Sequence, residues 1–347
     1  MKSFENKFIS NLKLGLDEVS QIRAIGEYKG KEELCRRQSP EALEQLLESA
    51  IVQSAESSNR IEGILAAPHR VKKIVKDNVA PRNRPEQEIA GYRDVLNQIH
   101  QSHKDIPLSE NVVLQFHSML YRYTGIGAGN WKLGENEIVD ILKDGKTKLR
   151  FKPVSPFETP EYVKKLIANY NHQLNKDHTE PLVAIPLFVL DFLCIHPFSD
   201  GNGRMARLLT LLLLYQSGYQ VGKYISLERI IEDSKKTYYE VLYQSSQDWH
   251  QGKHDVFPWL RYFYGTLLAA YKEFEERVGT YKGKGSKTDQ VKAAVDKFIK
   301  PFSISEVEGA CPNVTRDMIR LVLRQLRDEN KIKTTGQGRS ARWQKIG

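Results

Sequence analysis

The sequence is poor in cysteine, with three in 347 residues. Cys35, Cys194 and Cys311 are far apart and form no CxxC pair, so neither a disulfide framework nor a structural zinc site is expected. An odd number of isolated thiols is typical of a protein in a reducing compartment. We therefore expect a cytoplasmic protein.

Long apolar runs are also absent. The first ten residues lack the apolar segment of a secretory signal peptide. The longest apolar stretch, from Met205 to Tyr215, is shorter than the roughly 20 residues of a membrane-spanning helix, and it contains Arg207. We interpret it as a buried helix and expect no contact with a membrane.

Excess positive charge is present at one end of the chain only. The net charge is +9, and residues 280–347 contain 15 Lys and Arg against 7 Asp and Glu, an excess of eight. The basic character therefore belongs to this tail, and the rest of the chain is close to neutral.

Apolar residues recur at spacings of three and four over much of the chain, which predicts a mainly helical fold. One helix is expected to begin after Ser39, with Pro40 at its first position. The segment from Pro81 to Pro85 interrupts the pattern, and the segment from Gly279 to Thr288 has the composition of a linker. Further helices are predicted over Glu86–His100, Glu110–Tyr123, Val183–Ile195, Ser234–His250 and Val256–Val278.

One β-hairpin is expected among these helices. Two β-prone segments, Ile138–Leu142 and Thr147–Phe151, flank a turn that contains Asp144 and Gly145. An isolated two-stranded ribbon is marginally stable in water, so we expect this one to lie against another part of the chain.

The basic tail has its own pattern. Three short helices are predicted over Asp289–Ile299, Ser303–Gly309 and Thr315–Asn330, followed by strands over Ile332–Thr335 and Ala341–Ile346, an order that resembles a winged helix-turn-helix. An apolar stripe lies beside a basic stripe on the third helix, and more basic residues follow. The pattern suits DNA phosphates, although it also occurs on solvated faces and in winged helices that bind proteins. The apolar stripe is Ile319, Val322, Leu323 and Leu326; the basic residues are Arg316, Arg320, Arg324, Arg327, Lys331, Lys333, Arg339 and Arg342.

The segment from His196 to Arg207, HPFSDGNGRMAR, links two apolar helices. Gly201 and Gly203 allow a sharp turn, and with Asn202 they place backbone N–H groups at a helix N-terminus, which suits phosphates. Arg204 and Arg207 share a face of the second helix, where both can reach a polyphosphate.

Two further residues complete this chemistry. Asp200 precedes the N–H groups and is a candidate Mg²⁺ ligand. His196 has an ordinary pKa of about 6.5, so it can accept a proton near neutral pH. The segment therefore predicts attack by a hydroxyl group on the phosphorus of a bound nucleotide, with His196 as the general base.

Each of these short patterns alone is more often structural, but the whole string resembles the signature of the Fic (Fido-domain) family, HPFx(D/E)GNGRxxR. The resemblance implies a compact all-α fold that transfers AMP from ATP to Ser, Thr or Tyr hydroxyls of target proteins. It implies that His196 is the base and Asp200 the Mg²⁺ ligand. It assigns the α- and β-phosphates to Gly201, Asn202 and Gly203, and the β- and γ-phosphates to Arg204 and Arg207.

The resemblance extends to the adenine side and to the hairpin. Tyr239 corresponds to a position that borders the adenine, whereas Ser246 stands where relatives often have Asn. The hairpin at 138–151 corresponds to the family's flap, which pairs its edge with the target segment. Lys132 stands where the family commonly has Arg.

A second segment, Ser57–Gly63, resembles the family's inhibitory motif (S/T)xxxE(G/N), with Ser58 and Glu62 four residues apart on one helix face. The resemblance implies an N-terminal inhibitory helix over about 41–63. In this class Glu62 pairs with Arg207 and thereby removes Arg207 from the γ-phosphate.

The predicted domains are a helical region at 1–106, a catalytic core at 107–252, a helix and linker at 253–288, and a winged-helix-like domain at 289–347. Two alternatives to AMP transfer remain open: a hydrolase that removes AMP from a modified target, and a DNA-binding regulator whose core senses ATP. Self-modification and a homodimer are also open.

Overall fold

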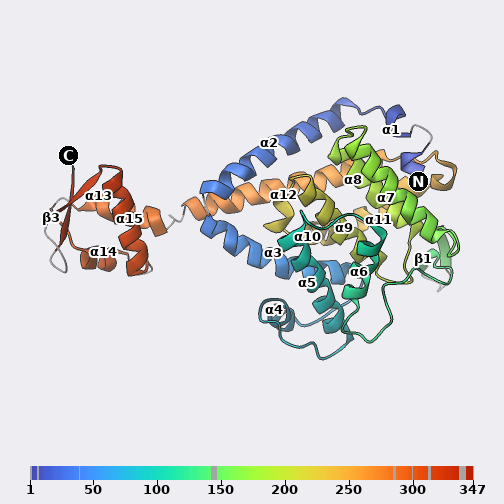
Figure 1. Cartoon of the computed structure of the whole chain (residues 1–347), viewed down its shortest axis with the longest axis horizontal. Coiled ribbons are helices and arrows are strands. Elements are labelled where there is room, and N and C mark those ends of the chain that lie inside the picture. Colours follow the sequence, from blue (N-terminus) through green and yellow to red (C-terminus); the bar gives the residue numbers. More distant parts are fainter. Residues whose placement is uncertain are drawn as a thin grey trace. The chain divides into compact units, whose positions relative to one another are not determined.

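The computed structural model describes residues 2–5, 8–38, 40–141, 147–283, 287–298, 300–311, 314–335 and 341–346 (Figure 1). The chain is mainly helical, as predicted, and forms two compact units, residues 1–275 and 276–347. The predicted boundaries at 106/107 and 252/253 lie inside the first unit. Helices from all three predicted regions pack together there: α3 (Pro40–Ile61) packs against α10 (Leu227–Asp233), and Trp259 of α12 (Phe257–Gly283) donates a hydrogen bond to the Pro186 carbonyl (2.8 Å).

The first unit contains most of the helices, with three short 3₁₀ segments among them. None of the helices in the described residues has the length and apolar character needed to cross a membrane. The helices are α1 Phe8–Asn11, α2 Leu16–Gln38, α3 Pro40–Ile61, α4 Pro68–Lys76, α5 Arg84–Ser102, α6 Glu110–Leu120, α7 Thr159–Asn175, α8 Pro181–Ile195, α9 Asn202–Gln216, α10 Leu227–Asp233, α11 Lys235–Ser246 and α12 Phe257–Gly283; the 3₁₀ segments are η1 Lys2–Phe4, η2 Val221–Lys223 and η3 Trp249–Gln251.

Helices α8 and α9 form the centre of the first unit. Nearly all of their side chains are buried, including those of Arg204 and Arg207 in α9. They pack against each other, α8 also packs on α7 and α11, and α9 also packs on α5, α6 and α3. The short connection between α8 and α9 is therefore held by the core on both sides.

Several helix boundaries differ from the prediction by a few residues, and two of the differences have a clear physical reason. Helix α5 begins at Arg84 with Pro85 in its first turn, where a missing N–H does no harm, and the Asn83 side chain accepts a hydrogen bond from the Glu86 N–H (3.0 Å). The linker predicted from Gly279 to Thr288 is wrong at both ends, because α12 continues through Gly283 and α13 begins at Lys287. One glycine weakens a helix by only about 1 kcal/mol, so an established helix can continue through it.

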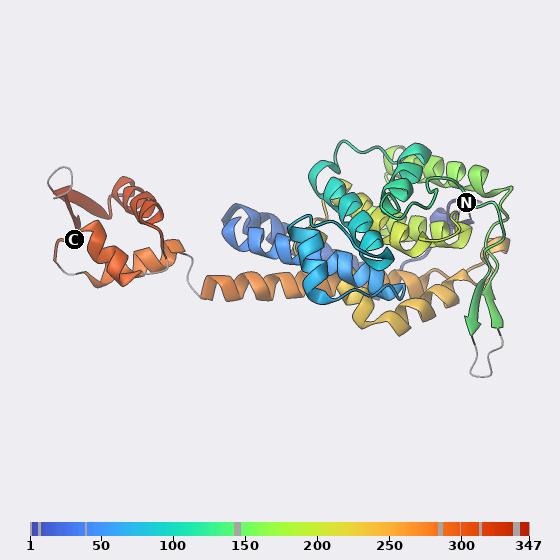
Figure 2. The ribbon, with the colours of Figure 1, turned by 90° about the horizontal axis from the view of Figure 1, so that it is seen from below.

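The predicted hairpin is present as β1 (Ile138–Ile141) and β2 (Thr147–Phe151), which pair antiparallel with an irregularity between Ile138 and Val139. The residues predicted to form its turn, 142–146, lie outside the described residues. The hairpin extends from the helical body (Figure 2), and its base contacts α11 and η3. The Phe151 ring stacks on His250 at 5.4 Å, and the Arg150 guanidinium lies 4.8 Å from the Tyr243 ring centre.

The second unit has the predicted order of elements: α13 Lys287–Lys297, α14 Ile304–Ala310, α15 Arg316–Asp328, β3 Ile332–Thr335 and β4 Arg342–Lys345. The two strands pair antiparallel, and Phe302 forms a further bridge to Trp343. The predicted apolar stripe of α15 is buried: Ile319, Val322, Leu323 and Leu326 join one core with Val291, Phe302 and Trp343. The likeness to a winged helix stays a prediction.

Candidate active site

The predicted catalytic segment is the tight connection between α8 and α9. Helix α8 ends at Ile195 and is followed by His196, whose φ of +53° is left-handed; α9 begins after Gly201, whose φ is +82°. A left-handed histidine costs on the order of 1 kcal/mol and persists only where the surroundings hold it. The connection thereby places the His196 ring and the N-terminus of α9 beside one cavity.

The His196 ring has a defined proton arrangement. Its Nδ1 lies 3.2 Å from the Leu193 carbonyl oxygen, and because a carbonyl only accepts, Nδ1–H is the donor. The Nε2 atom of the neutral ring is then an acceptor. Burial lowers the pKa of His196 to about 4. The imidazole is therefore neutral, with Nε2 available as a base, throughout the physiological range.

This pKa can be tested directly. In the free protein, the His196 resonance followed by NMR is expected to titrate near pH 4. In urea-unfolded protein the same ring is expected to titrate near its usual value of about 6.5, because the burial that disfavours the imidazolium is lost. A midpoint above pH 6 in the folded protein would show that the ring is not held in a buried neutral form.

The N-terminus of α9 presents the predicted backbone N–H groups, and the Asn202 side chain clamps the loop beneath them. The Asn202 Oδ1 accepts from the Phe198 N–H (2.9 Å), and its Nδ2 donates to the Phe198 carbonyl (2.7 Å). A Cβ at Gly203 would overlap the Glu62 carboxylate, so the glycine leaves room for this carboxylate in front of the helix. The Glu62 side chain therefore lies directly in front of these N–H groups.

Arg207 is buried and connects α9 to α3. Its Nε donates to the Ser58 Oγ (2.8 Å), and its Nη2 donates to the Ser58 carbonyl (2.8 Å) and to the Glu62 Oε1 (2.7 Å). Its Nη1 has no hydrogen-bond partner in the described part of the protein and lies 3.3 Å from the Cβ position of Gly203. One buried guanidinium N–H group thus faces the N-terminus of α9 without a partner.

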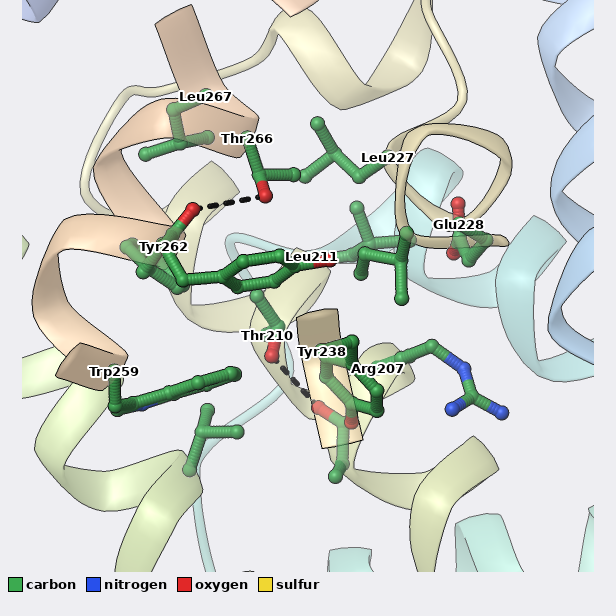
Figure 3. Close-up of a pocket in the computed structure, with 14 residues that line it drawn as sticks. Arg207, Thr210, Leu211, Leu227, Glu228, Tyr238, Trp259, Tyr262, Thr266 and Leu267 are labelled. Atoms are coloured by element: carbon green, nitrogen blue, oxygen red, sulfur yellow. Dashed lines mark hydrogen bonds between the residues drawn. The ribbon is translucent and has the colours of Figure 1, made fainter. Parts of the chain in front are cut away.

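The aliphatic stem of Arg207 crosses the edge of a small apolar cavity of about 30 Å³, room for roughly one water molecule (Figure 3). Helices α9, α10, α11 and α12 line it, and the guanidinium points away from Trp259 and Tyr262. This apolar wall keeps water away from one side of the charge, which strengthens its interaction with an anion on the other side.

Arg204 is more enclosed than the sequence predicts. Only 1% of its side chain is exposed, and it donates to the Glu88 Oε2 (2.5 Å), the Tyr121 hydroxyl (2.7 Å) and the Asn59 Oδ1 (3.3 Å). The Asp200 Oδ2 lies 3.6 Å away. Arg204 therefore supports the loop from below, between α5 and Asp200.

Asp200 presents an ionised carboxylate at the edge of the loop. Burial alone would raise its pKa, but the Tyr121 hydroxyl, the Arg204 charge and the Gly201 N–H outweigh burial and lower the pKa. No cluster of three or more candidate metal ligands occurs in the described residues. A single carboxylate still fits Mg²⁺ that arrives with substrate phosphates, because Mg²⁺ keeps waters and uses few protein ligands.

A cavity of about 280 Å³ connects these groups to the hairpin and to α11. Glu62, His196 and Gly203 are part of its lining, so the predicted base, N–H groups and inhibitory carboxylate share one cavity. The rest of the lining is mostly aromatic and apolar, and contains the predicted adenine-side residues. It comprises Ile138, Arg150, Phe151, Leu190, Leu193, Cys194, Tyr238, Tyr239, Leu242, Tyr243 and Ser246.

Comparison with known proteins agrees with this geometry. A family model described as the Fic/DOC family matches residues 107–214. These residues form a Fic domain. A segment of the chain is 34% identical over 93 residues to the protein adenylyltransferase fic-1 of Caenorhabditis briggsae, which is 25% of this chain and 18% of that protein. Another is 37% identical over 67 residues to a Fido domain-containing protein of Dictyostelium discoideum, which is 18% of this chain and 47% of that protein.

Solved Fic structures share the fold. A Fic family protein from Desulfovibrio desulfuricans aligns with a TM-score of 0.63 at 22% identity, over 97% of this chain and 98% of that one. Fic-1 of Caenorhabditis elegans aligns with a TM-score of 0.58 at 20% identity, over 77% and 74% of the two chains. The chain spans less than half the length of the curated relatives it matches.

The Fic domain also contains groups that sequence reasoning did not assign to the site. Asn136 donates to the carbonyls of His196 (3.0 Å) and Phe198 (2.8 Å). The buried Lys132 donates to Asn136 (2.7 Å) and to the Ile195 carbonyl (3.1 Å), and burial lowers its pKa to about 8. His117 stacks on Phe198 at 3.7 Å, accepts from the Gly129 N–H and donates to the Asp200 carbonyl.

Lys132 is therefore expected to position the His196 loop. We expect Lys132→Met to lower the kcat for nucleotidyl transfer about 10-fold with little change in KM for ATP, because a misplaced base slows chemistry more than binding. Lys132→Arg keeps charged donors at this position and is expected to retain most of the activity. Equal losses in the Met and Arg variants, or a loss in KM alone, would contradict this role.

Proposed function

We propose that this protein transfers AMP from ATP to a hydroxyl group of a protein substrate. The observation that carries the proposal is the arrangement around one cavity of a neutral His196, the N–H groups of α9 and the unpartnered Arg207 Nη1. An acceptor for a proton thus lies beside donors for a polyphosphate. The name of the C. briggsae relative, protein adenylyltransferase, supports the same activity.

The reaction follows from these positions. The target hydroxyl oxygen attacks the α-phosphorus of ATP, its proton passes to the His196 Nε2, and the bond to the bridging oxygen of the β-phosphate breaks to release pyrophosphate. The N–H groups of Gly201, Asn202 and Gly203 stabilise the charge on the phosphate oxygens. Arg207 holds the γ-phosphate, whereas Arg204 acts from beneath the loop. Asp200 would hold a Mg²⁺ ion that arrives with the phosphates, and the ion would neutralise part of the developing negative charge.

The adenine is expected to lie against the aromatic residues that line the cavity, beside Tyr239. The target segment is expected to add as a strand to the hairpin, because each strand of a two-stranded sheet pairs on one side only. Recognition through backbone hydrogen bonds would position a hydroxyl of the target, or of a second copy of this chain, in front of His196.

We further propose that Glu62 inhibits the enzyme. Its carboxylate occupies the space in front of Gly203 and pairs with Arg207, so the γ-phosphate and Glu62 compete for the same guanidinium. Ser58, in the last turns of α3, accepts two hydrogen bonds from Arg207 and thereby fixes the position of the guanidinium.

Removal of AMP from a modified target is a second candidate, because Glu62 and His196 line the same cavity and could orient a water molecule. The experiment is to incubate the Glu62→Gly protein with ATP and a cell lysate and to analyse modified proteins by mass spectrometry. AMP adducts on Ser, Thr or Tyr support transfer. Release of AMP from a pre-modified target by the wild-type protein, with no adduct formed by either protein, supports hydrolysis.

A further inference from the structure

The second unit carries a surface that the proposed chemistry does not use. We propose that this unit binds duplex DNA through the basic face of α15, formed by Arg316, Arg320, Arg324 and Arg327. All four side chains are exposed, and the buried side of the helix faces the unit's own core. Spacings of four, four and three residues keep the four arginines on one side of the helix.

Local ion pairs do not neutralise this face strongly. Arg320 pairs with Asp317 at 3.1 Å, Arg316 with Glu308 at 2.9 Å and Arg327 with Asp328 at 2.9 Å. Each arginine side chain in these pairs is about half exposed, and exposed pairs contribute about 0–1 kcal/mol. A DNA phosphate can therefore displace the carboxylates. Arg324 has no ion-pair partner in the described part of this unit.

The β-ribbon of the same unit adds to the basic surface. Lys333 on β3 pairs with Gln344 on β4, so Arg342 is its diagonal neighbour on the same face of the ribbon. Lys333 and Arg342 are both exposed. The major groove of DNA admits an exposed α-helix, and a short basic ribbon next to that helix can contact the adjacent DNA backbone.

Charge and apolar exposure favour a nucleic acid over a protein partner. Residues 276–347 contain 16 Lys and Arg against 8 Asp and Glu, an excess of eight in the sequence. Among the described residues of this unit, the large exposed apolar side chains are Leu321 and Ile346, too few for an apolar protein interface. Duplex DNA is favoured over duplex RNA, because the deep, narrow major groove of RNA does not admit a helix.

The test uses the full-length protein and a fluorescently labelled DNA duplex of mixed sequence, with binding measured by anisotropy at several salt concentrations. We expect Arg320→Glu/Arg324→Glu to weaken binding at least 10-fold and to reduce the slope of log K against log salt by about 2, since each lost phosphate contact removes about 0.9. The matched control is Lys164→Glu/Lys176→Glu, which makes the same charge change at exposed positions of α7 and its end. This control is expected to stay within about twofold of wild type.

Three outcomes would overturn the proposal: no binding at low salt, equal losses in the two double variants, or tighter binding to duplex RNA than to DNA. Capture of a protein partner by this unit with no DNA affinity would assign the surface to that partner instead. Because His196 is not involved, His196→Ala protein is expected to bind DNA like wild type, so this test is independent of the proposed AMP transfer.

Discussion

Replacing Glu62 with glycine is expected to raise AMP incorporation from α-labelled ATP roughly 100-fold, both into target proteins and into the protein itself. The Glu62 carboxylate pairs with the buried Arg207 at 2.7 Å and fills the space in front of Gly203. If the closed state is favoured by about 2.7 kcal/mol, about one molecule in a hundred is active. This free energy is within the range of one partly buried, charge-assisted hydrogen bond. Removing the carboxylate frees Arg207 for the γ-phosphate.

A matched comparison uses two single variants, Glu62→Ala as the test and Glu56→Ala as the control. Both residues belong to the α3 region, and alanine preserves the helix, but Glu56 pairs with the exposed Arg60 rather than with the site. Initial rates of incorporation are expected to rise for Glu62→Ala and to stay at the wild-type level for Glu56→Ala. An unchanged rate in both Glu62 variants, with folded protein shown by circular dichroism, would remove the inhibitory role.

Replacing His196 with alanine in the Glu62→Gly protein is expected to lower AMP transfer about 10³-fold, within the range of general-base catalysis. The Nε2 of the neutral ring is the only proton acceptor assigned to the reaction, and the N–H groups of α9 and Arg207 remain in place. Binding of ATP, measured by calorimetry, is therefore expected to change less than about threefold.

His69→Ala in the same background is the control, because His69 is an exposed histidine on α4. Its transfer rate is expected to match that of Glu62→Gly alone. If the His196 variant also transferred AMP at that rate, the proton would have to leave by another route. If the His196 variant lost both AMP transfer and ATP binding, the substitution would have disrupted the loop and not only removed the base.

The sequence predicted the parts of the site that are contiguous in the chain. The turn from His196 to Arg207 and the segment from Ser58 to Gly63 are short patterns in which residue type and spacing carry the chemistry. The contact between these two segments in the folded chain was also expected from the family resemblance. The helices around these segments were predictable because apolar residues at spacings of three and four indicate a helix with a buried face. The apolar faces of these helices are buried in the core.

The residues that hold the loop were not predictable from local patterns. Asn136, His117 and Glu88 act through contacts with residues about 60 to 116 positions away, and nothing in their own neighbourhood marks them. Lys132 was noticed only as a departure from the family pattern, and its burial depends on the tertiary fold. The ends of the predicted linker were wrong for a related reason, because a Gly- and Lys-rich composition does not show how far a neighbouring helix continues into it.

The most direct test of the central claim is to determine which phosphorus atom of ATP becomes covalently attached to protein. Glu62→Gly protein is incubated in parallel with ATP labelled at the α-phosphorus and with ATP labelled at the γ-phosphorus, and protein-bound label is quantified after denaturation. The account predicts stable label from the α position only, and its loss when His196 is also replaced by alanine. Label from the γ position, or α label that does not require His196, would contradict it.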